Sequence, residues 1–256
     1  MFMTIKKQTI VYAFCVLLVI SIAVICLATK EAKQDVETEE EVQQKPITVL
    51  TDKTILIDPG HGGFDAGASA NGLEEKNINL AVALKLKDCV NDMGGRAVLT
   101  RESDTSTADP NRKDGSTAKA SDLKRRKAMA EECGADIMIS IHMNKFEQSE
   151  YWGAQVFYAE NSEESKTLGE TIQAALPKVL NDNNDRVAKK SNGQIYILKN
   201  VKIPTVIVEC GFLSNPSEAK KLSDEEYQNN LAKAICVGIE DYFNKKIEEN
   251  SEQRGY

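Results

Sequence analysis

The 256-residue chain has little of several things that would define a specialised class of protein. It contains only 15 Gly, 6 Pro and 6 Cys, which excludes a collagen-like chain, a low-complexity polymer and a small disulfide-stabilised scaffold. Acidic residues number 39 against 32 Lys and Arg, and no basic stripe is present. Nucleic acid is therefore not an expected partner, because binding it requires clustered cations. With 41% hydrophobic residues, the chain suffices for one ordinary domain and an appendage.

Uncharged residues are concentrated in one long run near the amino terminus. Residues 9–28 carry no charged side chain, and a helix of twenty residues spans about 30 Å, the thickness of a bilayer's hydrocarbon core. Lys6 and Lys7 precede the run and acidic residues follow it, which places the amino terminus inside and the remainder outside. We expect residues 1–28 to form one N-terminal transmembrane helix that acts as a signal anchor. A signal peptide cleaved near Ala28 is the alternative.

The next segment, residues 29–46, is charged and almost free of large apolar side chains. It cannot bury enough surface to offset the entropy of ordering, so it predicts a flexible tether. Residues 47–256 then form one exported domain, which is held at the membrane or, if the signal is cleaved, secreted.

Short runs rich in Ile and Val alternate with longer segments of helical period in this domain. The alternation predicts a single α/β domain with a largely parallel, twisted sheet of about six strands and helices on both faces. The expected strands cover residues 54–58, 97–100, 136–142, 154–159, 194–198 and 205–209. The expected helices cover residues 77–93, 121–133, 163–180 and 224–243, the last of them starting at a capping box formed by Ser223 and Glu226.

The chain has only two histidines, and both follow apolar strands. His61 lies in the glycine-rich sequence DPGHGG after the first strand, and His142 ends the sequence IMISIH. A third strand, TVIVE, ends in Glu209. Because the carboxyl ends of strands are where open α/β sheets build their sites, we expect these three side chains to meet at one edge of the sheet.

Two imidazoles and nearby carboxylates are typical of a zinc hydrolase. Catalytic zinc takes three protein ligands, often two His and one Glu, and a further carboxylate then serves as general base. Two imidazoles also favour zinc over magnesium or calcium. The third ligand is expected at Glu74 or Glu75, at the entrance of the helix that follows the His61 loop, and spacing alone does not choose between them.

Four segments of the domain resemble, in the same order, the motifs of the zinc-dependent N-acetylmuramoyl-L-alanine amidases of bacterial cell-wall metabolism. They are DPGHGGFDAGASANGLEEKNINLAVAL, LTR, LKRRKAMAEECGADIMISIHMN and IPTVIVECGFLSNPSEAKKL. The resemblance covers about residues 54–243. One small domain behind one apolar segment is similar to the spore germination-specific members of this family.

The resemblance implies a residue set and a reaction. It implies one Zn²⁺ ion held by His61, Glu75 and His142, and Glu209 as the catalytic acid and base, while Glu74 becomes a solvated neighbour. The implied reaction is hydrolysis of the amide between the lactyl group of N-acetylmuramic acid and L-alanine of the peptidoglycan stem peptide. For a germination-specific member, the substrate is spore cortex in the forespore space and the product feeds muramic-δ-lactam formation.

Several weaker expectations accompany this hypothesis. Asn144 is a candidate substrate-binding residue, Arg101 could reach the edge of the site, and Lys76 is expected to be exposed. The basic run at residues 124–127 predicts a solvated helix face. No segment is apolar and periodic enough to cover the metal site, so either the site is open by default or zinc loading depends on an activating protein partner.

Two alternative functions remain open. A zinc peptidase acting on the stem peptide would need the same ligands and general base. A non-enzymatic peptidoglycan-binding scaffold would not need Glu209.

Overall fold

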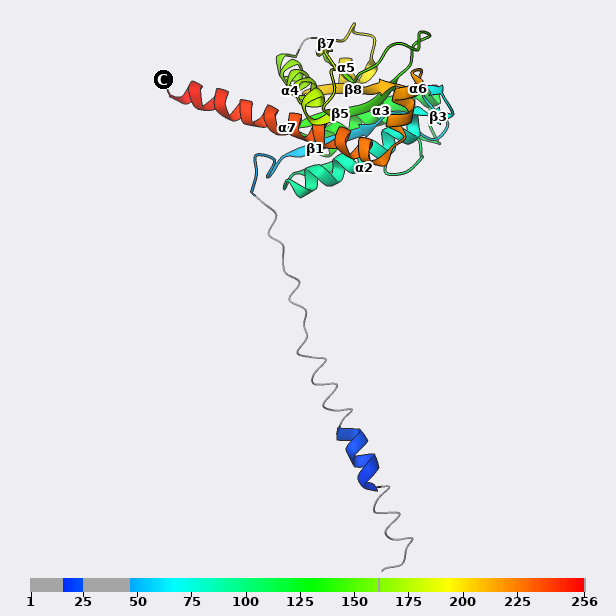
Figure 1. The fold of residues 1–256 in the computed structure, drawn as a ribbon, viewed down its shortest axis with the longest axis vertical. Helices are drawn as coiled ribbons and strands as arrows, with labels where there is room; N and C mark the ends of the chain where they lie inside the picture. Colours follow the sequence, from blue (N-terminus) through cyan, green and yellow to red (C-terminus); the bar gives the residue numbers. More distant parts are fainter. Residues whose placement is uncertain (1–15, 25–46, 161, 256) are drawn as a thin grey trace, which may run out of the picture. The chain divides into compact units, whose positions relative to one another are not determined.

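The computed structural model describes residues 16–24, 47–160 and 162–255 (Figure 1). The chain divides into two units, residues 1–44 and residues 45–256. Within the first unit, residues 16–24 form a helix with exposed side chains. Among the described residues, no helix has the length and apolar character needed to cross a bilayer. The rest of the predicted membrane segment and the whole predicted tether lie outside the described residues.

The second unit is built on a mixed sheet of six strands in the order β4-β1-β5-β8-β6-β7. β4, β1, β5 and β8 run parallel, and β6 is antiparallel to β8, so the predicted largely parallel sheet is confirmed with one reversal. The strands are β4 (Arg96–Leu99), β1 (Thr54–Pro59), β5 (Ile137–Asn144), β8 (Thr205–Phe212), β6 (Gln155–Tyr158) and β7 (Lys189–Lys190). A separate two-stranded sheet pairs β2 (Ser69–Ala70) with β3 (Leu73–Glu74).

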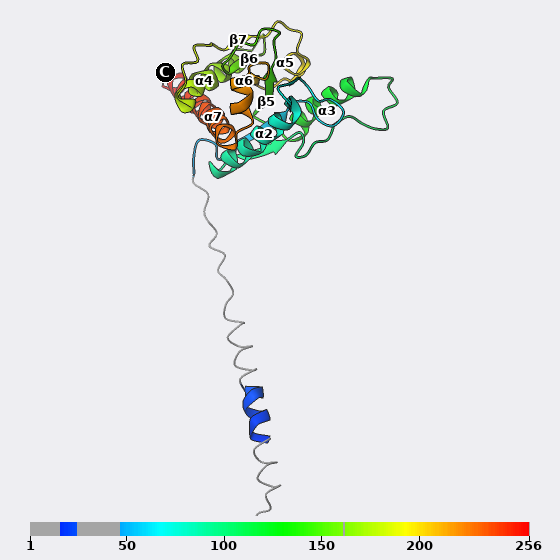
Figure 2. The ribbon, with the colours of Figure 1, turned by 45° about the vertical axis from the view of Figure 1, so that its right-hand side comes forward.

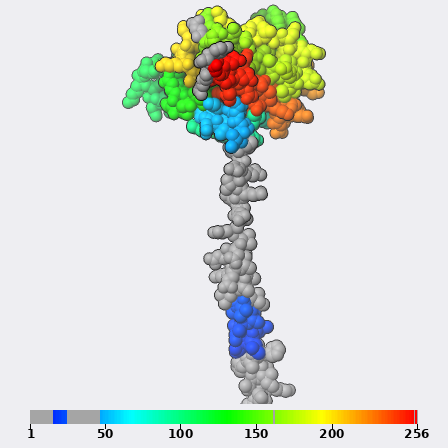
Figure 3. Space-filling model, turned by 90° about the vertical axis from the view of Figure 1, so that its left-hand side faces the viewer, coloured from blue at the N-terminus to red at the C-terminus, as the bar shows by residue number. Residues whose placement is uncertain are grey.

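Helices cover both faces of the large sheet (Figures 1 and 2). One face, which includes Ile55 and Ile139, packs against α2 (Glu75–Asp92), α4 (Glu163–Leu180) and α7 (Glu225–Arg254). The other face, which includes Leu56 and Met138, packs against α3 (Ala118–Glu132) and α5 (Tyr196–Asn200). α6 (Pro216–Leu222) lies in the chain between β8 and α7. Figure 3 shows α7 exposed along the outside of the domain, and in Figure 1 its carboxyl-terminal end projects beyond the sheet.

The alternation of side chains along each strand determines what reaches the site. On the face covered by α3 and α5, the sequence along β5 runs from Met138 through Ser140 to His142. Asp58 of β1 is the register partner of Ser140, and Glu209 of β8 is the register partner of His142. This face therefore changes from apolar at the amino ends of the strands to polar and reactive at their carboxyl ends.

One predicted strand is wrong. Residues 194–198 do not pair with the sheet, and α5 forms there instead, while the sixth strand is the short exposed segment β7. The sequence QIYIL alternates like a strand, but the buried Ile197 and Leu198 pack into two different apolar clusters. Adjacent side chains on a helix can pack into two clusters on the same side of a sheet, whereas adjacent side chains on a strand point to opposite faces of the sheet.

The predicted capping box of the last helix is also wrong. Asp224, not Ser223, caps α7, and its Oδ1 accepts a 2.9 Å hydrogen bond from the backbone N–H of Tyr227. Ser223 instead ends α6, a helix that the sequence pattern did not predict. α6 ends at Leu222 and α7 begins at Glu225, and the hydroxyl of Ser223 donates a hydrogen bond to the carbonyl of Lys220 in the last turn of α6.

Candidate active site

Three adjacent strands of the sheet end at the predicted site. β1 leads into the loop that carries His61, β5 carries His142 near its end, and β8 carries Glu209. Glu75 is the first residue of α2 and enters from the side. The structure thus brings together the four residues expected to carry the chemistry.

The loop that presents His61 is tightly constrained. His61 has φ +61°, a left-handed conformation that costs a residue with a side chain about 1–2 kcal/mol. Two glycines leave room for the imidazoles: a Cβ on Gly60 would lie 2.3 Å from the His142 ring, and one on Gly67 would lie 2.7 Å from the His61 ring. These contacts explain why this loop contains glycine where the rings approach the backbone.

Glu75 lies between the two histidines. Its Oε1 is 2.9 Å from His142 Nδ1, and its Oε2 is 3.3 Å from His61 Nε2. One ligand atom from each of these three residues lies within 4.8 Å of the others. Two imidazole nitrogens and one carboxylate oxygen at this spacing match the donor set of a catalytic zinc site, so these residues could hold the ion.

Contacts outside the three candidate ligands fix their orientation. Glu75 also accepts hydrogen bonds from the backbone N–H groups of Ala68 (2.7 Å) and Met143 (3.1 Å). On the far side of the His61 ring, Asp65 Oδ2 lies 3.0 Å from Nδ1, although the two atoms are not aligned as a hydrogen bond. A carboxylate in this position is a common support for a metal-binding histidine.

The electrostatics of the cluster favour a cation. Burial opposes ionisation of Glu75, but hydrogen bonds and charge from His142 and His61 outweigh it and hold its pKa far below the ordinary value of 4.5. Burial acts against a charged His142, yet the Glu75 carboxylate raises the pKa of that imidazole. In each case a negative carboxylate is stabilised by positive charge at the imidazoles, and a metal ion would supply such charge.

Glu209 has the properties of a general base. Its Oε2 atom is buried and has no hydrogen-bond partner among the residues that the structure describes. Burial, assisted by the Glu75 charge and opposed by His142 and His61, raises its pKa to about 7. A carboxyl with a pKa near neutrality can both accept and release a proton at working pH, which suits acid–base catalysis.

Glu209 and His142 face a cavity of about 260 Å³. Its floor comes from the sheet and includes Ser140 and Ile207. Part of its wall is apolar and comes from Leu123 of α3 and from residues 195–197 at the start of α5, and charged side chains that include Lys119, Asp122 and Arg126 line the rest. The cavity therefore offers a reactive end and an apolar side to a bound molecule.

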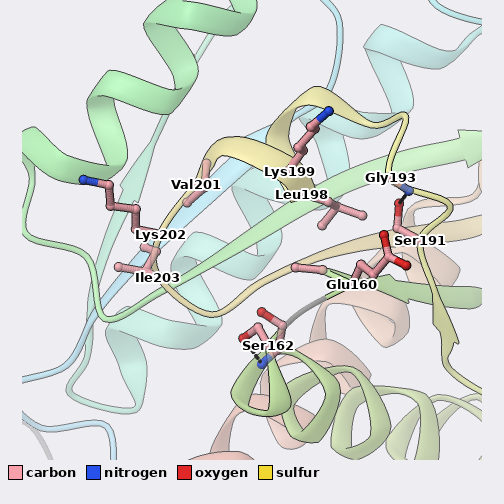
Figure 4. Close-up of a pocket in the computed structure, with 11 residues that line it drawn as sticks. Glu160, Ser162, Ser191, Gly193, Leu198, Lys199, Val201, Lys202 and Ile203 are labelled. Atoms are coloured by element: carbon pink, nitrogen blue, oxygen red, sulfur yellow. Dashed lines mark hydrogen bonds between the residues drawn. The ribbon is translucent and has the colours of Figure 1, made fainter.

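A larger cavity of about 360 Å³ lies on the other side of α5 and contains none of these groups. Figure 4 shows that its serines and Glu160 come from the start of α4 and the loops next to β6 and β7. The ammonium groups of Lys199 and Lys202 point away from the space between these residues (Figure 4). The chemistry thus belongs to the smaller cavity.

The weaker sequence predictions have different outcomes. Glu74 is exposed at the start of α2, as expected of a solvated neighbour. Asn144 does not line the cavity, and its Oδ1 accepts a hydrogen bond from the backbone N–H of Lys145. Lys76 is not freely exposed, because its Nζ donates to the carbonyl of Gly63 (3.1 Å) and to Asp104 Oδ2 (2.7 Å).

The predicted solvated face at residues 124–127 is wrong at one position. Arg126 is only 2% exposed and forms ion pairs with Asp58 and Asp122 in the lining of the cavity, whereas its neighbour Arg125 is exposed and pairs with Glu132. The spacing of Asp122 and Arg126, four residues apart on one helix, is the signal that could have shown this buried pair.

Comparison with known proteins places this site in a family. The model of the N-acetylmuramoyl-L-alanine amidase family matches residues 55–241. The germination-specific N-acetylmuramoyl-L-alanine amidase of Bacillus subtilis is 41% identical over 197 residues, covering 77% of this chain and 82% of that protein. Uncharacterized protein YqiI of the same organism is 36% identical over 195 residues, covering 75% of this chain and 86% of that protein.

Solved structures agree. The CwlD amidase from Clostridioides difficile, determined in complex with the GerS lipoprotein, has 43% identity and a TM-score of 0.71, covering 75% of this chain and 99% of that one. An N-acetylmuramoyl-L-alanine amidase from Clostridium difficile 630 has 30% identity and a TM-score of 0.67, covering 76% of this chain and 98% of that one. The matched region contains the whole His61, Glu75, His142 and Glu209 constellation, and the chain belongs to the N-acetylmuramoyl-L-alanine amidase family.

Proposed function

We propose that the protein is a zinc-dependent amidase that cleaves the bond between the lactyl group of N-acetylmuramic acid and L-alanine of the peptidoglycan stem peptide. The observation that supports this is the cluster of His61, Glu75 and His142 beside a buried carboxyl, Glu209, in a domain of this family. His61, Glu75 and His142 would hold the ion, and Glu209 is left free of it for proton transfer.

The residues of the chain divide the reaction between them. A bound zinc ion would polarise the scissile carbonyl and make a water molecule more acidic. Glu209 accepts the proton of the attacking water on its unpartnered Oε2 and then donates it to the alanine nitrogen as the amide bond breaks. The apolar part of the wall, formed by Leu123 and residues 195–197, suits the methyl groups that flank this amide.

The physiological setting follows from the relatives. Because one relative is a germination-specific amidase, we propose that the substrate is spore cortex and that the product feeds muramic-δ-lactam formation. Because CwlD was determined in complex with a lipoprotein, we propose a protein partner for this chain as well, with a role in zinc loading. Residues 1–28 would export the domain and, if retained, anchor it at the membrane facing the wall.

A digest of purified peptidoglycan tests the activity. The domain, loaded with zinc, is incubated with peptidoglycan beside its Glu209→Gln variant, and mass spectrometry identifies the released material. Stem peptides with a free L-alanine amino terminus, absent from the variant reaction, would support the proposal. Cleavage inside the stem would instead indicate a zinc peptidase, and binding without cleavage would indicate a scaffold.

A further inference from the structure

Three successive backbone carbonyls of the His61 loop are held by two arginine side chains. Arg101 Nε donates to the carbonyls of Pro59 (3.0 Å) and His61 (2.8 Å), and its Nη2 donates to that of Gly60 (3.1 Å). Arg126 donates from Nη1 to Pro59 O (2.9 Å) and from Nη2 to His61 O (2.6 Å). The left-handed conformation of His61 is thus maintained from the carbonyl side by two guanidinium groups.

Arg101 also connects this loop to the helix that carries Glu75. Its Nη2 donates to the carbonyl of Lys76, in the first turn of α2, at 2.8 Å. Its five hydrogen bonds to described residues all go to backbone carbonyls, and the residue is only 5% exposed. One planar group therefore fixes the distance between the backbone of His61 and the backbone next to Glu75.

Arg126 connects the same loop to the strand that carries His142. It pairs with Asp58, whose other oxygen accepts a 2.7 Å hydrogen bond from Ser140, two residues before His142 on β5. Arg126 is itself held by Asp122 one helical turn earlier. The two arginines together join the three elements that bear His61, Glu75 and His142.

We propose that Arg101 and Arg126 are positioning residues that set the metal-binding geometry of the site, a role that rests on the proposed zinc binding. Arg126 also lines the cavity, but neither arginine needs to touch the ion for this role. Their effect comes from the fixed fork of the guanidinium, which donates in several directions in one plane. A lysine keeps the charge, but its three N–H groups all radiate from one nitrogen, so it cannot reach all the carbonyls that the spread nitrogens of the guanidinium reach.

The test compares lysine variants on the zinc affinity of the domain. Arg101→Lys and Arg126→Lys are measured by competition with a chromophoric chelator. Arg125→Lys is the matched control, because Arg125 is exposed next to Arg126 on α3 and pairs with Glu132. We expect zinc to bind about 10–100-fold more weakly to the first two variants. The visible absorption spectrum of the Co²⁺-substituted domain should change for both and stay unchanged for Arg125→Lys.

Thermal unfolding of each metal-free variant shows whether a loss of zinc affinity comes from misplaced ligands in a folded domain or from a domain that is no longer folded. A variant that unfolds at the assay temperature is replaced by the other, since each arginine holds the His61 carbonyl independently. Wild-type zinc affinity and cobalt spectrum in folded Arg101→Lys or Arg126→Lys would overturn the positioning role alone. Failure of the wild-type domain to bind zinc would overturn the proposed function and this inference with it.

Discussion

The site has two halves that are built in different ways. His142 and Glu209 lie on neighbouring strands and are register partners, so pairing of β5 with β8 already places their side chains together. His61 and Glu75 lie outside the sheet, on a loop and at a helix start, and their positions depend on glycine contacts and on buried arginines. The position of His142 and Glu209, the strand half, follows from the local pattern of the strands. The position of His61 and Glu75, the loop half, depends on residues far away in the sequence.

The largest change in activity is expected from a substitution of Glu209, in the strand half. Glu209→Gln keeps the shape of the side chain but removes its ability to carry the proton. We expect the turnover number to fall about 10³-fold, within the range of general acid–base catalysis. The rate of release of stem peptides with a free alanine amino terminus measures this.

The same variant should leave metal binding almost unchanged, because Glu209 is not part of the proposed ligand cluster. Zinc affinity measured by chelator competition is the control. Loss of zinc binding in Glu209→Gln would show that the strand half supplies more ligands than His142.

The loop half is tested by two adjacent glutamates. Glu75→Gln should weaken zinc binding more than about 100-fold, beyond the loss typical of an outer supporting residue, because a neutral amide replaces a proposed ligand. Glu74→Gln, its exposed neighbour, should bind zinc like the wild type. Isothermal titration with zinc compares the two, and equal affinities would contradict the assignment of Glu75.

Sequence reasoning predicted the strand half well, since a histidine or glutamate at the end of an apolar strand is visible in the pattern. The residues alone left Glu74 and Glu75 undecided, because one residue of difference at a helix start decides which carboxylate turns inward. The family resemblance pointed to Glu75, and the structure shows it buried between the two imidazoles.

Arg101 was expected near the edge of the site, but the supporting role of Arg101 and Arg126 was not predicted, for a physical reason. Arg101 binds carbonyls 40 to 42 positions away, and Arg126 binds carbonyls 65 to 67 positions away. Backbone acceptors leave no trace in the side-chain pattern, so only the spacing of Arg126 from Asp122 could have pointed to a buried arginine. The wrong prediction of a strand at residues 194–198 has a related origin. The pattern of apolar residues does not show that the side chains of one segment pack into two separate clusters.

The strand half also carries an energetic cost that depends on pH. In the metal-free domain, burial raises the pKa of Glu209 from 4.5 to about 7, so the folded domain binds a proton that the unfolded chain has lost between these values. Stability therefore falls as pH rises through this window, by up to about 3 kcal/mol above pH 7. Glu209→Gln removes this cost.

Urea denaturation of the two metal-free proteins from pH 4 to pH 8 measures the difference. The free energy of unfolding of Glu209→Gln should exceed that of the wild type by about 3 kcal/mol at pH 8, and this excess should disappear near pH 4. An excess that is constant with pH would mean that Glu209 ionises normally in the folded domain.

The contact between the two halves is tested at Gly60. Its backbone is not left-handed, so Gly60→Ala acts only through the new methyl group, 2.3 Å from the His142 ring. We expect a stability loss of about 1–3 kcal/mol from overpacking and, because His142 must move, zinc binding weaker by about tenfold. Gly72→Ala is the control: its φ of +77° adds backbone strain, but no atom lies within 4 Å of the new Cβ. If both variants are destabilised but only Gly60→Ala binds zinc more weakly, the loop half and the strand half bind the ion as one packed unit. Equal zinc affinities in the two variants would show that the two halves adjust independently.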